Sequence, residues 1–396
     1  MAGIYVHIPF CKKRCIYCDF YSTTCMEVQK PYIEALVNEI TLRADYLKVN
    51  GELPLIETIY IGGGTPTTLE TLSLARILDT IYCTYPVASD AEVTIECNPD
   101  DLSDKKIQEL RHLPINRLSI GIQTFSDPHL HLLNRRHDSQ QAIRAVKTCQ
   151  DVGFDNISID LIYGLPKQSL DDWASNLNIA TELNVQHISA YSLIYEEGTR
   201  LYEMRQQGQA EEASEQMSLT MFNTLIDHLA TAGFEHYEIS NFARIGYRSR
   251  HNSSYWKGIP YLGCGPSAHS YDGTHRQWNS AHLHNYIQNV SHCKTPTDFT
   301  HASWIEKEEL SIYEQYNDLI ITALRTSDGL DLLHLRKKFG DQLTNYCLKN
   351  ASKHLNNGLL EIIKEKEQYP EGLLKLTRQG IFVSDGVMSD LLFIED

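Results

Sequence analysis

The sequence has no run of about 18 or more apolar residues, the length that a membrane-spanning helix needs. Its N-terminus also lacks the basic and apolar segments of a signal peptide, because it leads directly into the strand-like run 4–8. These absences predict a cytoplasmic protein without an integral membrane segment. They leave peripheral contact with a membrane open.

Positive charge is scarce as well. The sequence has 35 Lys and Arg residues but 51 Asp and Glu residues, which gives a formal net charge of -16. Nonspecific binding to nucleic acid depends on clustered cations, so we expect no nucleic-acid partner. The 396 residues, 42% of them hydrophobic, are enough to bury the cores of one large and one small domain.

The ten cysteines do not suggest a disulfide framework, because three lie within eight residues and the others are scattered through apparent core segments. In a reducing compartment, three cysteines this close together indicate a metal-binding site. Cys11, Cys15 and Cys18 have the spacing C-x3-C-x2-C, in a loop directly after the first expected strand. Three thiolates can hold three irons of a cubane and leave the fourth iron open. A structural zinc site, completed by His7 or Cys25, is the alternative.

Short β-branched runs alternate with longer runs of helical periodicity, such as 141–154 and 218–234. This order predicts an α/β fold with parallel strands and right-handed crossovers. Six such units are too few for a closed eight-stranded barrel, so we expect an open, partial (β/α)6 TIM-like barrel. The expected strands lie near 4–8, up to 61, near 92–97, and near 117, 157 and 187.

The pattern changes after about residue 300 to three helical runs and two short strand-like pieces. We therefore expect a small C-terminal helical, winged-helix-like domain, and a division of the chain into 1–240, 241–300 and 301–396. The helical runs are 306–325, 330–340 and 342–358, and the strand-like pieces are 359–363 and 373–377.

Polar residues recur where the expected strands end. Glycines and a threonine follow the second strand in 62–67, and Glu96, Gln123 and Asp160 mark the third, fourth and fifth. In a parallel barrel the loops at these ends converge on one mouth. Each residue alone fits a turn or a helix cap, but their regular recurrence predicts a ligand site.

The cysteine spacing and the segment GGGTP resemble the radical S-adenosylmethionine (SAM) superfamily. This resemblance implies a [4Fe–4S] cluster on Cys11, Cys15 and Cys18. It also implies that SAM binds to the open iron and is cleaved to a 5′-deoxyadenosyl radical. Over nearly the whole chain, YVHIPFC, TIECNPD, LSIGIQTF, LLNRRH and IDLIYGLP resemble the oxygen-independent coproporphyrinogen III oxidase family.

The family resemblance implies two SAM molecules, one on the cluster and one beside it. It places Tyr5, Gly63 and Glu96 at the first molecule. It places the remaining candidates at the second molecule: Tyr17, Gly64, Thr65, Gln123, Arg135 and Asp160.

Three features resemble the heme-chaperone branch of this family more than the oxidase. Phe20 stands where the oxidase branch carries a fourth cysteine, only ten residues precede Cys11, and residues 251–256 match the signature HNxxYW. The signature implies heme as a cofactor, with the imidazole of His251 as an axial ligand. His269 is a weaker second candidate, while Tyr255 and Trp256 could equally be core residues.

The resemblance therefore implies a protein that hands heme to client hemoproteins and lacks coproporphyrinogen III dehydrogenase activity. The alternatives are the oxidase itself, which decarboxylates coproporphyrinogen propionates, and a radical enzyme acting on another substrate. The oligomeric state stays open, with a homodimer among the alternatives.

Overall fold

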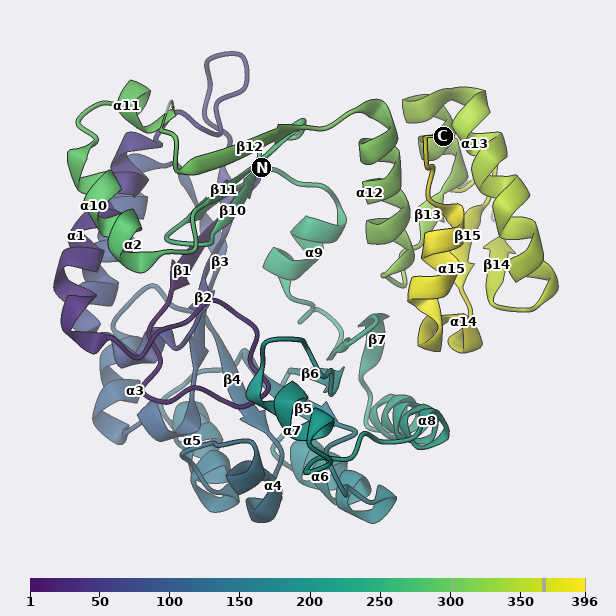
Figure 1. The fold of residues 1–396 in the computed structure, drawn as a ribbon, viewed down its shortest axis with the longest axis horizontal. Helices are drawn as coiled ribbons and strands as arrows, with labels where there is room; N and C mark the ends of the chain where they lie inside the picture. The colour runs from purple at the N-terminus through teal and green to yellow at the C-terminus, as the bar shows by residue number, and fades with distance from the viewer. Residues whose placement is uncertain (301, 365–367, 396) are drawn as a thin grey trace.

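The structure is a computed structural model that describes residues 1–300, 302–364 and 368–395. All six expected strands are present as parallel neighbours at the centre of one sheet, in the order β1-β2-β3-β4-β5-β6 (Figure 1). Their carboxyl ends share one edge, as the barrel prediction requires. The strands are β1 Ala2–Ile8, β2 Ile56–Gly63, β3 Val87–Cys97, β4 Arg117–Gln123, β5 Ile157–Tyr163 and β6 His187–Ser192.

Helices connect these strands and follow the outside of the sheet in Figure 1. The two helical runs expected at 141–154 and 218–234 are confirmed as α5 and α8. Each is followed by a glycine in the left-handed region, Gly153 at φ +97° and Gly233 at φ +83°, which ends the helix. The helices are α1 Gln29–Leu42, α2 Thr71–Thr84, α3 Asp104–Arg111, α4 Asp127–Leu132, α5 Ser139–Asp151, α6 Leu170–Glu182, α7 Arg200–Gln206 and α8 Glu215–Thr231.

The sheet has twelve strands in the described residues, and six of them were not expected. Each has only three to five residues and little β-branched character, so backbone pairing with a neighbouring strand determines them. Only β9 is parallel to its central neighbour, β1. The additional strands are β7 Glu235–Glu238, β8 Asn241–Ala243, β9 Tyr261–Cys264, β10 His269–Tyr271, β11 His275–Asn279 and β12 Ile305–Glu309.

The helix expected from residue 306 begins later than predicted. Residues 306–309 belong to β12, which pairs antiparallel with β11. Ser311 then caps α12 (Ile312–Leu324) in a capping box with Glu314, and this cap fixes the start of the helix. The predicted start was wrong because a charged edge strand and a first helical turn are alike in composition.

The C-terminal region is helical with a small sheet, as predicted, and packs around its own hydrophobic core from Tyr316 to Leu391. The larger core runs from Ala2 to Phe299. The division into three parts stays a prediction. The remaining elements are α9 Arg250–Trp256, α10 Leu283–His292, α11 Pro296–Thr300, β13 Leu330–Asp331, α13 Leu332–Asn356, β14 Leu360–Ile363, β15 Leu373–Leu376, α14 Arg378–Phe382 and α15 Ser384–Leu391.

None of the helices in the described part of the chain combines the length and the apolar character needed to cross a bilayer.

Candidate functional site

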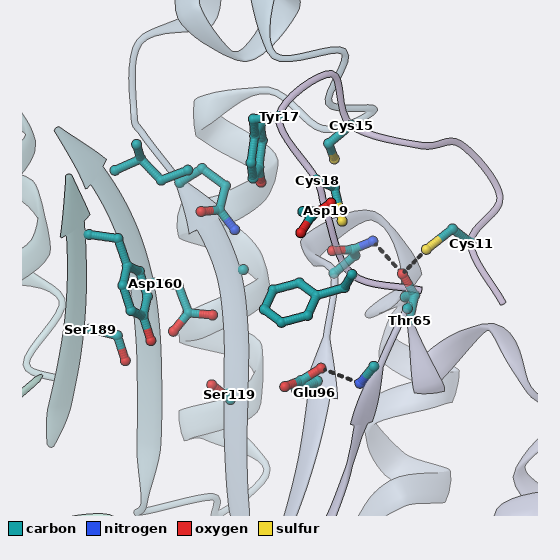
Figure 2. Close-up of a pocket in the computed structure, with 18 of the residues that line it drawn as sticks. Cys11, Cys15, Tyr17, Cys18, Asp19, Thr65, Glu96, Ser119, Asp160 and Ser189 are labelled. Carbon is teal, nitrogen blue, oxygen red and sulfur yellow. Dashed lines mark hydrogen bonds between the residues drawn. The ribbon is translucent and has the colours of Figure 1, made fainter. Parts of the chain in front are cut away.

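A cavity of about 520 Å³ lies at the carboxyl ends of the central strands (Figure 2). Two of the expected residues, Tyr5 and His251, are not among the residues that line it. All the other expected residues contribute to its wall: Cys11, Cys15, Tyr17, Cys18, Gly63, Gly64, Thr65, Glu96, Gln123, Arg135 and Asp160. Eleven residues from six segments of the chain therefore share one cavity.

The loop after β1 carries the three cysteines along one side of this cavity, across from Glu96 and Asp160 in Figure 2. Backbone hydrogen bonds between the cysteine loop and Thr23 fix its start, and the Cys11 thiol lies 3.6 Å from Thr65 Oγ1. Gly64 permits this packing, because a Cβ there would lie 2.8 Å from the Phe10 carbonyl oxygen and 3.0 Å from Cys11 Sγ. Gly64, directly after β2, thus allows the cysteine loop to approach the sheet.

The zinc alternative needs His7 or Cys25 as a fourth ligand beside the three cysteines. Among the residues that the structure describes, no three His, Cys, Asp or Glu side chains are grouped to hold one metal ion. Both nitrogens of His7 are also engaged, since Nε2 donates to the Tyr21 carbonyl and Nδ1 accepts from Tyr5. Cys25 does not line the cavity.

Glu96 is the carboxylate at the end of β3. It accepts hydrogen bonds from Tyr60 Oη at 2.8 Å and from the Gly63 amide at 2.9 Å. Burial raises the pKa of Glu96 to about 7, and the charge of Asp160 adds to this shift while the hydrogen bonds oppose it. An ammonium group in the cavity would reverse the effect, because it favours the ionised carboxylate.

Asp160 is the second carboxylate, between Ser119 and Ser189 of the neighbouring strands. Burial raises the pKa of Asp160 to about 6, while hydrogen bonds from the two serines and the charge of Arg117 lower it. Arg117 is 2% exposed, and its Nε has no hydrogen-bond partner within the described ranges. The floor of the cavity therefore holds two carboxyl groups and one buried guanidinium.

Arg135 lies beside the cysteine loop. Its Nη1 is 3.3 Å from Cys15 Sγ, and its Nη2 donates to Asn98 Oδ1 at 2.8 Å and to the Gly121 carbonyl. Gln123, also on the wall, has a left-handed backbone with φ +73°, which is a strained conformation for this residue type. Polar contacts and strain thus concentrate at the same end of β4.

Tyr5 lies behind the cavity wall. Its ring stacks on Tyr60 with 6.1 Å between centroids, and its hydroxyl donates to His7. In this structure Tyr5 supports the wall through Tyr60.

His251 at the start of α9 is also behind the wall and is 2% exposed. Its Nδ1 is hydrogen-bonded to Thr58 Oγ1 and its Nε2 to Tyr255 Oη, both at 2.8 Å. The ring stacks on Tyr60 with 5.1 Å between centroids. Burial lowers the pKa of His251 to about 3, so the imidazole is neutral. His269, the weaker candidate, is exposed and stacks on Trp278.

The sequence did not reveal several residues of this wall. Tyr60 and Arg117 lie within expected strands, where a tyrosine between isoleucines and an arginine in an apolar strand are the local signals of a special role. Asn252 follows His251 directly and does line the cavity. The other unexpected wall residues include Ser119, Ser189 and Tyr191. Phe20 is part of the wall too and is 72% exposed, which places it at the rim.

Comparison with known families and proteins supports the sequence resemblance. The profile of the radical SAM superfamily matches residues 5–179, and that of the HemN C-terminal domain matches residues 310–383. A protein of Bacillus subtilis (strain 168) named heme chaperone HemW is 33% identical over 99% of both chains. The heme chaperone HemW of Lactococcus lactis is 35% identical over 86% of this chain and 88% of that one.

A solved structure, coproporphyrinogen III oxidase (HemN) from Escherichia coli, has the same fold. It superposes with a TM-score of 0.82 over 98% of this chain and 90% of that one, at 24% identity. The open barrel and the C-terminal domain therefore have the same arrangement as in that structure. The full-length similarity to the relatives above shows that the chain belongs to the HemW family of radical SAM proteins.

Proposed function

We propose that the chain holds a [4Fe–4S] cluster on Cys11, Cys15 and Cys18, with SAM beside it in the cavity. The observation that carries this proposal is that the three thiols of one loop and the carboxyl groups of Glu96 and Asp160 line the same cavity. When bound, a cluster with an open iron supplies the electron that cleaves SAM.

The chain's own residues would then bind and orient SAM. Glu96, fixed by Tyr60 and Gly63, presents a carboxylate to the methionyl ammonium, while Asp160 can accept from ribose hydroxyls. A second SAM beside Tyr17, Gln123 and Arg135 is a further part of the proposal. In the structure Arg135 already donates to Cys15, Asn98 and Gly121, so it has to exchange one of these contacts to bind a carboxylate.

We further propose that the protein is a cytoplasmic heme chaperone that delivers heme to client hemoproteins. The support comes from the relatives named heme chaperone HemW, together with residues 251–256 and the exposed Phe20 at the rim. A homodimer and peripheral membrane contact stay predictions. The runner-up function is that of an oxygen-independent coproporphyrinogen III oxidase. The E. coli protein that shares the fold is named coproporphyrinogen III oxidase.

Heme binding is expected to depend on His251. As an axial ligand, His251 would have to exchange Tyr255 Oη for iron at Nε2, because Thr58 holds Nδ1. His251→Ala should weaken heme binding roughly 10- to 100-fold, the effect typical of removing a group that ligates a metal or orients its site. Titration with hemin, followed by absorbance in the Soret region, measures this change.

His292→Ala is the matched control, because His292 is exposed at the end of α10 and lines no described cavity. The iron–sulfur content of His251→Ala should equal that of the parent. If His251→Ala and His292→Ala both bind heme as tightly as the parent, residues 251–256 have no part in the heme site.

A further inference from the structure

A second cavity, of about 410 Å³, is lined by Tyr255 and Trp256 of α9, whereas Asn252 of the same helix lines the cavity that holds the cysteines. In Figure 1, α9 lies between the sheet and the C-terminal region. Its wall combines α9 and β9–β11 with α12 and α13. The volume is within the range of about 300–1,000 Å³ that is typical of small-molecule sites. Neither the cluster nor SAM uses this cavity in the function proposed above.

Aromatic rings form one wall of this second cavity. Tyr255, Trp256, Tyr261 and Tyr271 all line it, and Tyr255 meets Tyr261 edge to face with 4.5 Å between centroids. The indole Nε1 of Trp256 is buried, yet it has no hydrogen-bond partner in the described part of the chain. A buried N–H without a partner calls for an explanation, and an acceptor on a bound molecule provides one.

Positively charged side chains line the same cavity, although the whole chain carries a formal net charge of -16. Lys257, Arg276 and Lys338 line it against a single acid, Asp318, which pairs with Arg276 at 2.5 Å. Neither lysine has an ion-pair partner among the residues that the structure describes. An occupant with two negative groups would balance the two lysines.

His334 is the histidine that lines the second cavity. It lies in the first turn of α13, its side chain is exposed, and it lines the cavity one helical turn before Lys338. Its backbone amide is held by Asp331, which caps the helix. Neutral imidazole with an accessible nitrogen is a usual ligand for heme iron. His251, by contrast, has both nitrogens engaged and stands behind Tyr255.

From this arrangement we propose that the second cavity is the heme site, in which aromatic side chains contact the porphyrin and Lys257 and Lys338 face its propionates. His334 ligates the iron in this site, and His251 is a positioning residue that holds Tyr255. The inference rests on the proposed heme-binding function. It places heme and SAM in separate cavities, with the contacting rings of Tyr60, His251 and Tyr255 between them.

Hemin titration of the parent, His334→Ala and His251→Ala, each with its cluster reconstituted, tests this assignment. His334→Ala should raise the dissociation constant about tenfold or more and shift the Soret band, since it loses an iron ligand. His251→Ala should weaken binding without shifting the band. Tyr255→Phe should behave like His251→Ala, because it removes the hydroxyl that His251 holds. His334 is exposed, so its replacement should leave the melting temperature unchanged.

A charge test uses the same titration. Lys257→Glu/Lys338→Glu should weaken heme binding, whereas Lys147→Glu/Lys349→Glu, which makes the same change at exposed sites outside the cavity, should not. If His334→Ala binds heme with the parent's affinity and spectrum while His251→Ala shifts the band, His251 is the ligand and the inference is wrong. Equal binding of metal-free protoporphyrin would also contradict ligation by His334. A parent that binds no heme at all would instead overturn the proposed function.

Discussion

Replacing Cys11, Cys15 and Cys18 together with alanine is expected to reduce the iron content of the anaerobically reconstituted protein from about four per chain to near zero. The three thiols line one cavity from a single loop, so no ligand should remain after the triple replacement. Iron and sulfide analysis together with the absorption spectrum of the cluster measures the effect.

Two single replacements serve as controls for the cysteine experiment. Cys25→Ala tests the zinc alternative, because Cys25 was its possible fourth ligand, and Cys83→Ala changes an exposed cysteine far from the loop in sequence. Both variants should keep the parent's iron content. Stoichiometric zinc in the parent, lost in Cys25→Ala, would contradict the cluster assignment.

Glu96→Gln is expected to weaken SAM binding roughly 10- to 100-fold, because a hydrogen bond to a charged group contributes about 1.5–3 kcal/mol. The substitution keeps the shape of the side chain and removes its charge. Glu70→Gln, at an exposed carboxylate outside the cavity, should have no effect. Calorimetric titration of the reconstituted protein with SAM measures both.

The same carboxylate predicts a pH dependence. Burial raises the pKa of Glu96 to about 7 and that of Asp160 to about 6 in the ligand-free protein, so both groups take up protons as the pH falls from 8 to 5. The ammonium group of SAM favours ionised Glu96, and a ribose hydroxyl that donates to Asp160 favours ionised Asp160. SAM affinity should therefore fall by up to about tenfold per pH unit per group below these values. Glu96→Gln should lose the part of this dependence near pH 7. An affinity for SAM that is constant from pH 8 to 5 in the parent would count against both carboxylates.

The central sheet could be predicted from sequence because its six strands are short runs with β-branched residues, separated by longer runs of helical periodicity. The edge strands could not, since a run such as β11 has no apolar alternation and is held by backbone pairing with β10 and β12. The start of α12 was misplaced because the charged residues 306–309 fit a helix equally well until the cap at Ser311 is considered.

The candidate site, like the fold, could be predicted only in part from sequence. Residues at strand ends, such as Glu96 and Asp160, were found because all parallel strands deliver their ends to one mouth. Residues that act from the middle of a strand, such as Tyr60, were missed, since nothing local marks which face they occupy. His251 was found by its motif, but a motif does not reveal that Thr58 and Tyr255 hold both ring nitrogens. The second cavity needed the structure, because α9 and α13 are distant in sequence.

The most direct test of the proposed heme chaperone function compares two reactions on one anaerobically reconstituted sample of the parent protein. Hemin is titrated into one portion, and coproporphyrinogen III is added with SAM and a reductant to the other. We expect saturable heme binding and no release of carbon dioxide from the porphyrinogen. Decarboxylation of coproporphyrinogen III by a sample that does not bind heme would show that the protein is the oxidase and would contradict the proposal.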